Sequence, residues 1–138
     1  MKIPIYSRER TICAEDTDEL DHVNNIVWLR FVVALAHAHA AAVGIAAEAH
    51  ERMGVAWVVR RHEIEYLRSA VLGERILEST WVTELRGARC RRAFAFRRVT
   101  NGETLVRAES LWAFVDRKTQ RPRRMPAEIL DRFAVVAS

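Results

Sequence analysis

The sequence predicts a single α+β domain, residues 1–138, in which an antiparallel sheet curls over one long apolar helix. Three observations lead to this prediction. The longest apolar run, residues 26–43, is rich in alanine and contains no Gly or Pro, which favours a helix. Long segments rich in β-branched and aromatic residues follow from Val55 onward, separated by turns that contain Gly. Consecutive hairpins after one buried helix imply an antiparallel sheet packed on that helix.

The other elements are predicted from the same patterns, taken in chain order. Gly44 is expected to end the central helix, and Asn101-Gly102 is the clearest hairpin turn. Partial alternation puts Cys90, Phe94 and Phe96 on one face of their strand. The expected strands cover residues 5–15, 55–67, 74–85, 89–99 and 104–116, and the expected helices cover residues 26–43, 45–52 and 127–133.

Composition limits the class of protein. Half of the residues are hydrophobic and 29% are charged, which is typical of a soluble globular domain. The formal net charge is +4. Cys13 and Cys90 are far apart and form no metal-type pair, and the N-terminus lacks the apolar core of a signal peptide. The apolar run is too short, and too interrupted by Arg30, His37 and His39, for a convincing membrane span. We therefore expect a cytoplasmic protein that does not bind a membrane.

A polar cluster stands directly before the central helix and is the main candidate for a functional site. Residues 16–25 contain carboxylates, an imidazole and two amides. A helix N-terminus presents unpaired N–H groups that can polarise a carbonyl oxygen, and a carboxylate beside it is the minimal equipment for attack on an acyl group. Asp18 is the candidate carboxylate. The alternative is that these residues only cap the helix, for which Asp21 or Asn24 is suited.

The order of these residues resembles the signature of hotdog-fold thioesterases, the branch that includes 4-hydroxybenzoyl-CoA thioesterase and the plant acyl-ACP thioesterases. Their pattern reads approximately Asp-x-Asp-x-x-Gly/Gln-His-Val-Asn-Asn-x-x-Tyr. Here it appears as Asp16-Thr-Asp18-Glu-Leu-Asp21-His22-Val23-Asn24-Asn25-Ile-Val-Trp28. The segment Tyr66-Leu-Arg-Ser-Ala-Val-Leu-Gly73-Glu and the closing Val115-Asp-Arg-Lys-Thr-Gln-Arg-Pro122 also resemble family segments. The resemblance implies a hotdog fold over nearly the whole chain.

The chain departs from the family pattern at three positions that bear on chemistry. Asp21 stands where Gly or Gln is usual and adds a charge close to Asp18. Val33 stands where many members carry Glu on the central helix, and Trp28 replaces Tyr.

The resemblance implies hydrolysis of an acyl thioester, most readily acyl-CoA, with acyl-ACP as the other carrier. Asp18 would be the nucleophile or the general base, and His22 and Asn25 would orient the reacting groups. Backbone N–H groups near Asn24 and Asn25 would polarise the carbonyl, and Val23, Asn24 and Trp28 would contact the substrate. No metal or redox cofactor is implied. The family also implies a homodimer or homotetramer, with sheets joined edge to edge and active sites at the interface.

Arginines crowd the segment around residues 86–98 and the turn region from residue 117 onward. Arg91 and Arg92 are the predicted contacts for the phosphates of coenzyme A, as the family resemblance implies. Binding of single-stranded nucleic acid would need exposed aromatic residues between such charges, whereas Phe94 and Phe96 share a face that suggests core. We therefore expect no nucleic-acid partner.

Two other functions stay open. A hotdog enoyl-CoA hydratase also uses Asp and His before the helix, but with the pattern Asp-x-Asn-Pro-x-His. Here Asp18 and His22 are one residue closer and the Asn-Pro pair is missing. The second alternative is a non-catalytic protein that binds acyl thioesters, which the departures at Asp21 and Val33 allow.

Overall fold

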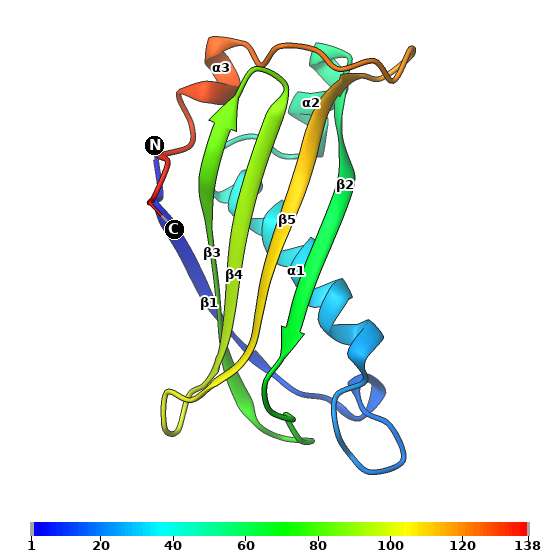
Figure 1. The fold of residues 1–138 in the computed structure, drawn as a ribbon, viewed down its shortest axis with the longest axis vertical. Coiled ribbons are helices and arrows are strands. Elements are labelled where there is room, and N and C mark those ends of the chain that lie inside the picture. Colours follow the sequence, from blue (N-terminus) through cyan, green and yellow to red (C-terminus); the bar gives the residue numbers. More distant parts are fainter. Residues whose placement is uncertain (1, 138) are drawn as a thin grey trace.

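The computed structural model describes residues 2–137 and confirms the predicted α+β architecture (Figure 1). Five strands form one antiparallel sheet in the order β1-β3-β4-β5-β2. The strands are β1 (Ile5–Thr11), β2 (Val55–Tyr66), β3 (Arg75–Arg86), β4 (Arg89–Arg98) and β5 (Thr104–Asp116). The helices are α1 (Asn25–Ala42), α2 (Ala47–Met53) and α3 (Ala127–Leu130), and η1 (Ala14–Asp16) is a single 3-10 turn. The sheet curls over α1, which is the hotdog arrangement.

The central helix α1 lies against the sheet through one face. Asn24 is its N-cap and accepts a hydrogen bond of 3.0 Å from the Ile26 N–H, so the cap is Asn24 and not Asp21. By length and composition alone α1 is also a candidate membrane span. Its contact with the sheet identifies it as the central helix of the domain. The buried residues recur at helical spacing and are Val27, Trp28, Phe31, Val32, Leu35, Ala36 and His39.

The end of α1 is fixed by Gly44, as predicted. Gly44 has a φ of 91°, in the left-handed region that favours glycine. Arg132 donates a hydrogen bond of 2.7 Å to the carbonyl oxygen of Val43. A Cβ atom at Gly44 would lie 2.5 Å from the same guanidinium nitrogen, so only glycine leaves room for this contact.

Three predicted elements differ from the observed ones. The first strand ends at Thr11 because η1 turns the chain, and the Asp16 carboxylate accepts a hydrogen bond of 3.0 Å from the Cys13 N–H. The last helix is only Ala127–Leu130. The prediction of consecutive hairpins throughout is wrong for β2 and β3, because β5 and β4 lie between them. The turn at Gly73 therefore belongs to a crossover rather than to a hairpin.

The crossover, residues 67–74, holds the loop that precedes α1. The Val23 N–H donates to the Ala70 carbonyl at 2.9 Å, and the Leu72 N–H donates to the Asp21 carbonyl at 3.0 Å. Ala70 is fully buried at this junction. The two sequence segments that carry the family resemblance are thus hydrogen-bonded to each other, although the bonded residues are 47 and 51 positions apart.

Candidate active site and the buried cavity

The loop of residues 16–25 is a tight structure held by its own backbone. Thr17 and Val23 form an isolated antiparallel bridge, and the Asp18 N–H donates to the His22 carbonyl at 2.8 Å. One oxygen of the Asp18 carboxylate, Oδ1, accepts from the N–H groups of Leu20 at 2.9 Å and His22 at 3.2 Å. Asp18 is exposed, so the carboxylate is oriented by the loop and remains open to solvent.

The backbone conformation of Asp21 bears on one departure from the family pattern. Its φ is 59°, the left-handed conformation in which Gly is the least strained residue and Asp is tolerated. The glycine usual at this position in the resembling family therefore suits the backbone that Asp21 adopts here.

The N-terminus of α1 has fewer free donors than the sequence suggested. The Asn24 N–H donates to the Asp16 carbonyl at 3.1 Å, and the Ile26 N–H donates to the Asn24 side chain. The Asn25 N–H occupies the first helical position, where no intrahelical acceptor exists. Of the two N–H groups that we expected to polarise a carbonyl, the one at Asn25 stays available and the one at Asn24 does not.

The other predicted residues of this region divide between loop and core. Asn25 is exposed, and its carbonyl oxygen accepts a hydrogen bond of 3.1 Å from the Tyr66 hydroxyl. His22 is half-buried. Val23 and Trp28 are buried in the core, where the Trp28 ring packs edge-on against Phe96. The contact of Val23 and Trp28 with substrate stays a prediction, and both side chains are turned toward the sheet.

Exposed apolar side chains surround this loop. We call them the loop patch. They come from the loop itself, from the first turns of α1 and from the end of β2 with the crossover. Each is at least 36% exposed, and they are Leu20, Ile26, Leu29, Tyr66, Leu67, Val71 and Leu72.

The structure separates Arg91 from Arg92, which were predicted to bind phosphates together. Neighbouring residues of a strand point to opposite faces. Arg92 lies on the concave face with Cys90 and Phe94 and is 5% exposed, whereas Arg91 is half-buried on the outer face. Their binding of coenzyme A phosphates stays a prediction, and within one subunit the two side chains lie on opposite faces of the sheet.

Arg92 is held by α1 and β3. Its Nη1 donates to His39 Nδ1 at 2.7 Å and to the Thr80 hydroxyl at 3.3 Å. His39 Nε2 lies 2.7 Å from the carbonyl oxygen of Ile3, which can only accept, so the proton of the neutral imidazole is on Nε2. Burial, and then the charge of Arg92, lower the pKa of His39 to about 4. His39 is therefore a neutral acceptor for the guanidinium at pH 7.

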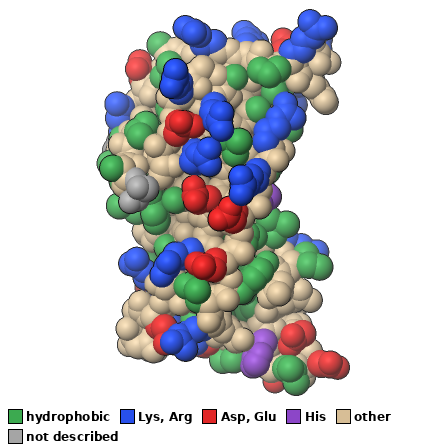
Figure 2. Space-filling view, viewed as in Figure 1, with side chains coloured by type: hydrophobic (Ala, Val, Ile, Leu, Met, Phe, Trp, Pro, Cys, Tyr) green, Lys and Arg blue, Asp and Glu red, His purple; other side chains and the backbone are tan. Residues whose placement is uncertain are grey.

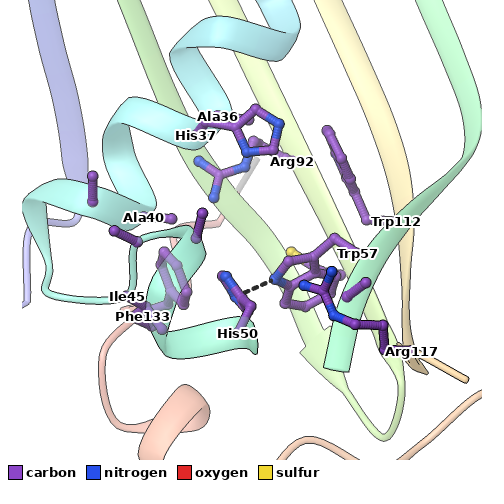
Figure 3. A pocket seen from close by; sticks show the side chains of 15 residues that line it. Ala36, His37, Ala40, Ile45, His50, Trp57, Arg92, Trp112, Arg117 and Phe133 are labelled. Atoms are coloured by element: carbon purple, nitrogen blue, oxygen red, sulfur yellow. Dashed lines mark hydrogen bonds between the residues drawn. The ribbon is translucent and has the colours of Figure 1, made fainter. Parts of the chain in front are cut away.

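A cavity of about 500 Å³ opens beside Arg92, between the second half of α1, α2 and the sheet (Figure 3). Its inner wall includes the buried residues Cys90, Arg92, Trp112 and Phe133. Exposed residues at its mouth are His37 and Arg117, with Ala41 and Ala47. Its lining residues on α1 run from Ala36 to Ala41, so the cavity lies toward the C-terminal end of α1, remote from the loop of residues 16–25.

Two further contacts define the polar groups of the cavity. Trp57 Nε1 donates to His50 Nε2 at 3.1 Å, and burial lowers the pKa of His50. Burial also raises the pKa of the Cys90 thiol to about 11, so it is protonated and unreactive at pH 7. Trp112 Nε1 is buried and has no hydrogen-bond partner among residues 2–137.

Sequence reasoning missed this cavity, although one signal was available. The alternation that put Cys90, Phe94 and Phe96 on the core face also includes position 92. An arginine inside a run of core positions indicates a buried guanidinium. His39 gave no such signal, because its partners come from Ile3 and β4, far away in the chain.

Within residues 2–137, no group of three or more His, Cys, Asp or Glu side chains lies close enough to hold a metal ion. His37 and His39 point to different sides, since His37 is exposed and His39 is 1% exposed. His62 is half-buried and lies 2.6 Å from the Ser110 hydroxyl.

The curled sheet, the central helix and the polar loop at its start together define a hotdog domain. The family model described as the acyl-ACP thioesterase N-terminal domain matches residues 5–133. The chain therefore belongs to this family.

Relatives and solved structures agree with this assignment. The chain is 36% identical over 73 residues to an acyl-[acyl-carrier-protein] hydrolase of Cuphea viscosissima, covering 53% of this chain and 18% of the relative. A 12:0-ACP thioesterase from Umbellularia californica superposes with a TM-score of 0.83 at 21% identity, covering 96% of this chain and 52% of that one.

A 1,4-dihydroxy-2-naphthoyl-CoA thioesterase from Synechocystis superposes with a TM-score of 0.84 at 16% identity, covering 91% and 93% of the two chains. These superpositions establish the hotdog fold. The aligned part of the chain spans less than a fifth of the length of the plant relative and about half of the Umbellularia structure.

Proposed function

We propose that this domain hydrolyses an acyl thioester at the loop of residues 16–25. The observation that carries the proposal is the exposed Asp18 carboxylate, which is oriented by two backbone N–H groups on the loop that enters α1. The Asn25 N–H at the start of that helix is available to polarise the thioester carbonyl. Family membership supports the same chemistry.

Asp18 acts by one of two routes. As a nucleophile, its oxygen attacks the carbonyl carbon, the carbon–sulfur bond breaks, the thiolate leaves, and water hydrolyses the mixed anhydride. As a general base, it takes a proton from water while the water oxygen attacks the same carbon. In both routes His22 and Asn25 orient the reacting groups.

A second copy of the chain completes the site in this proposal. The cavity begins at Ala36, eleven residues after Asn25, which is roughly 17 Å along a helix. A short acyl group cannot reach from the Asp18 loop of one copy into the cavity of the same copy. If the thioester carbonyl is bound at the Asp18 loop of one copy, the cavity that receives the acyl chain therefore belongs to another copy.

The free edge of β2 is the surface that we propose for this pairing. Among the described residues, β2 pairs with β5 alone, so its other edge carries backbone groups without a strand partner. Twofold antiparallel pairing of two β2 strands puts the start of one strand beside the end of the other. The start of β2 carries Trp57, which lines the cavity, and its end carries Tyr66, which contacts the Asp18 loop through Asn25. Such a dimer also covers the loop patch.

The carrier is anionic in this proposal, whether it is coenzyme A or an acyl carrier protein. Residues 117–124 contain five basic residues and no acidic one, and all are exposed. Arg117 lies at the cavity mouth, and Lys and Arg side chains gather over this end of the molecule (Figure 2). This segment attracts phosphates or the acidic surface of a carrier protein.

The experiment is release of free thiol from acyl-CoA and acyl-ACP substrates by the purified chain. We expect hydrolysis that is lost when Asp18 is replaced by Asn. Binding of the thioester without hydrolysis would instead identify a non-catalytic acyl-binding protein. Hydration of an enoyl-CoA without thiol release would identify a hydratase.

A further inference from the structure

Arg92 is a buried cation that has no carboxylate partner among residues 2–137. A second charged group on the concave face, Glu78, is fully buried and pairs with Arg8 and Arg10, both at 2.8 Å. Arg92 is 5% exposed, and no residue within 2–137 forms an ion pair with it. A buried charge that lacks an opposite charge is strongly destabilising unless another group compensates it. The neutral partners His39 and Thr80 compensate it only through hydrogen bonds.

The Arg92 guanidinium has further N–H groups that can donate hydrogen bonds to a ligand. Both hydrogen bonds described for it leave from Nη1, so Nε and Nη2 are not used by them. These two nitrogens form the side of the guanidinium that binds a carboxylate with two parallel hydrogen bonds. Figure 3 shows Arg92 reaching from β4 toward α1 at the cavity.

Trp112 supplies an independent indication of a ligand. It lines the same cavity, is 6% exposed, and its Nε1 has no acceptor within residues 2–137. A buried donor without an acceptor is destabilising, because it has lost its hydrogen bonds to water. Two incompletely used donors, one of them charged, thus line a single cavity. A ligand with an anionic acceptor would satisfy both.

The remaining wall of the cavity also favours an anionic ligand. Its lining contains Arg117, His37 and His50 besides Arg92, and no Asp or Glu. The other lining residues are mainly alanine, isoleucine and aromatic side chains. The mouth is exposed, whereas Arg92 and Phe133 lie at the buried side. The cavity therefore suits a ligand with an apolar middle and an anionic far end.

We infer that the cavity receives an acyl group whose far end carries a carboxylate, so that the substrate is the monothioester of a dicarboxylic acid. This inference rests on the proposed thioester hydrolysis. The apolar methylene groups contact the alanine-lined wall of α1, and the terminal carboxylate binds Nε and Nη2 of Arg92. The reaction at the thioester is unchanged, because the terminal carboxylate takes no part in it.

The test compares thioesters of equal chain length with and without a terminal carboxylate: adipoyl-CoA against hexanoyl-CoA, and suberoyl-CoA against octanoyl-CoA. We expect the wild-type protein to prefer the carboxylate-ended member of at least one pair. Arg92→Met should lower kcat/KM for that substrate by roughly 10- to 100-fold, the value of a buried charge-assisted hydrogen bond. Because Arg92 lines the acyl cavity, the result is read as the ratio of kcat/KM for the two members of a pair, and this ratio should fall in Arg92→Met. Arg97→Met, on the exposed outer side of the same strand, is the matched control and should change kcat/KM for neither substrate.

A binding measurement separates this inference from the proposed function. The probes are two CoA thioethers, S-(5-carboxypentyl)-CoA and S-hexyl-CoA, which contain no bond to hydrolyse. Tighter, Arg92-dependent binding of the carboxylate-ended probe supports the inference even if no thioester is hydrolysed. Hydrolysis of plain acyl-CoA with no preference for a terminal carboxylate overturns the inference and leaves the proposed function standing.

Trp112→Phe keeps the test decisive if Arg92→Met does not fold. This change removes Nε1 and retains an aromatic ring. It should weaken binding of the carboxylate-ended thioether and leave S-hexyl-CoA nearly unaffected. Equal effects on both probes would overturn the inference.

Discussion

His39 on α1 accepts a hydrogen bond of 2.7 Å from the buried guanidinium of Arg92 on β4, while its other ring nitrogen donates to the Ile3 carbonyl. The Tyr6 ring stacks on the imidazole, with ring centroids 5.6 Å apart. One neutral histidine thus connects the central helix, the first strand and the cavity. Its protonation would put two positive charges within hydrogen-bond distance in the core.

The first prediction is that stability falls in mild acid. The pKa of His39 is about 4 in the folded protein, below the ordinary histidine value of 6.5, so the unfolded chain binds the proton first. The stabilising contribution is therefore complete above pH 6.5 and is lost as the pH falls toward 4. It amounts to on the order of 2 to 3 kcal/mol. Denaturant unfolding at a series of pH values measures it.

The control for this prediction is on the same helix. His39→Gln removes the titration and should flatten the dependence between pH 6.5 and 4, although it lowers stability overall. His37→Gln changes an exposed histidine two residues away and should leave the slope intact. A wild-type curve without slope in this range would contradict the assignment of a neutral buried His39.

The second prediction concerns Asp18. Asp18→Asn keeps an oxygen that accepts from the Leu20 and His22 N–H groups, so the loop should keep its structure. It removes the nucleophile or base, and thioesterase activity should fall at least about a hundredfold. The measurement is kcat/KM by thiol release. Glu19→Gln, a neighbouring exposed carboxylate, should stay within a few-fold of wild type. Retained activity in Asp18→Asn would refute the role of this carboxylate.

The third prediction concerns the conformation of Asp21. With φ at 59°, Asp21→Gly and Asp21→Asn should both fold and keep activity within a few-fold of wild type, because both residues tolerate the left-handed region. Asp21→Val should lower the free energy of unfolding by roughly 1–2 kcal/mol, because a β-branched residue is strained there. Thermal or denaturant unfolding checks this. Glu19→Val is the matched control and should cost less. A large loss of activity in Asp21→Asn alone would show that the charge matters to the chemistry.

The fourth prediction concerns pairing through β2. Ile26 belongs to the loop patch and is 64% exposed, whereas Ile5 is 53% exposed on the opposite edge strand. Ile26→Glu should raise the dissociation constant of the dimer at least about tenfold, since burying one isoleucine contributes roughly 1.5–3 kcal/mol. Ile5→Glu should leave it unchanged. Analytical ultracentrifugation over a range of concentrations measures both. A wild-type chain that stays monomeric at high concentration would contradict the proposed dimer.

The sequence alone determined the elements and their order, because periodicity and turn residues are local properties. The strand from Thr104 to Asp116 was predicted with its exact bounds, and Gly44 ends α1 as expected. The Asp18 loop was found from a run of ten residues, because its geometry is held mainly by bonds within that run.

Tertiary structure decided everything that depends on contacts between distant segments. The crossover after β2, which holds the Asp18 loop, was read as a hairpin turn, since a turn residue does not reveal which strands it joins. Arg91 and Arg92 were paired as phosphate contacts from the family resemblance, whereas the alternation of β4 puts them on opposite faces. The cavity beside Arg92 exists only because α1, α2 and the sheet enclose it together. Burial and charge compensation are properties of such an enclosure, and a linear pattern does not contain them.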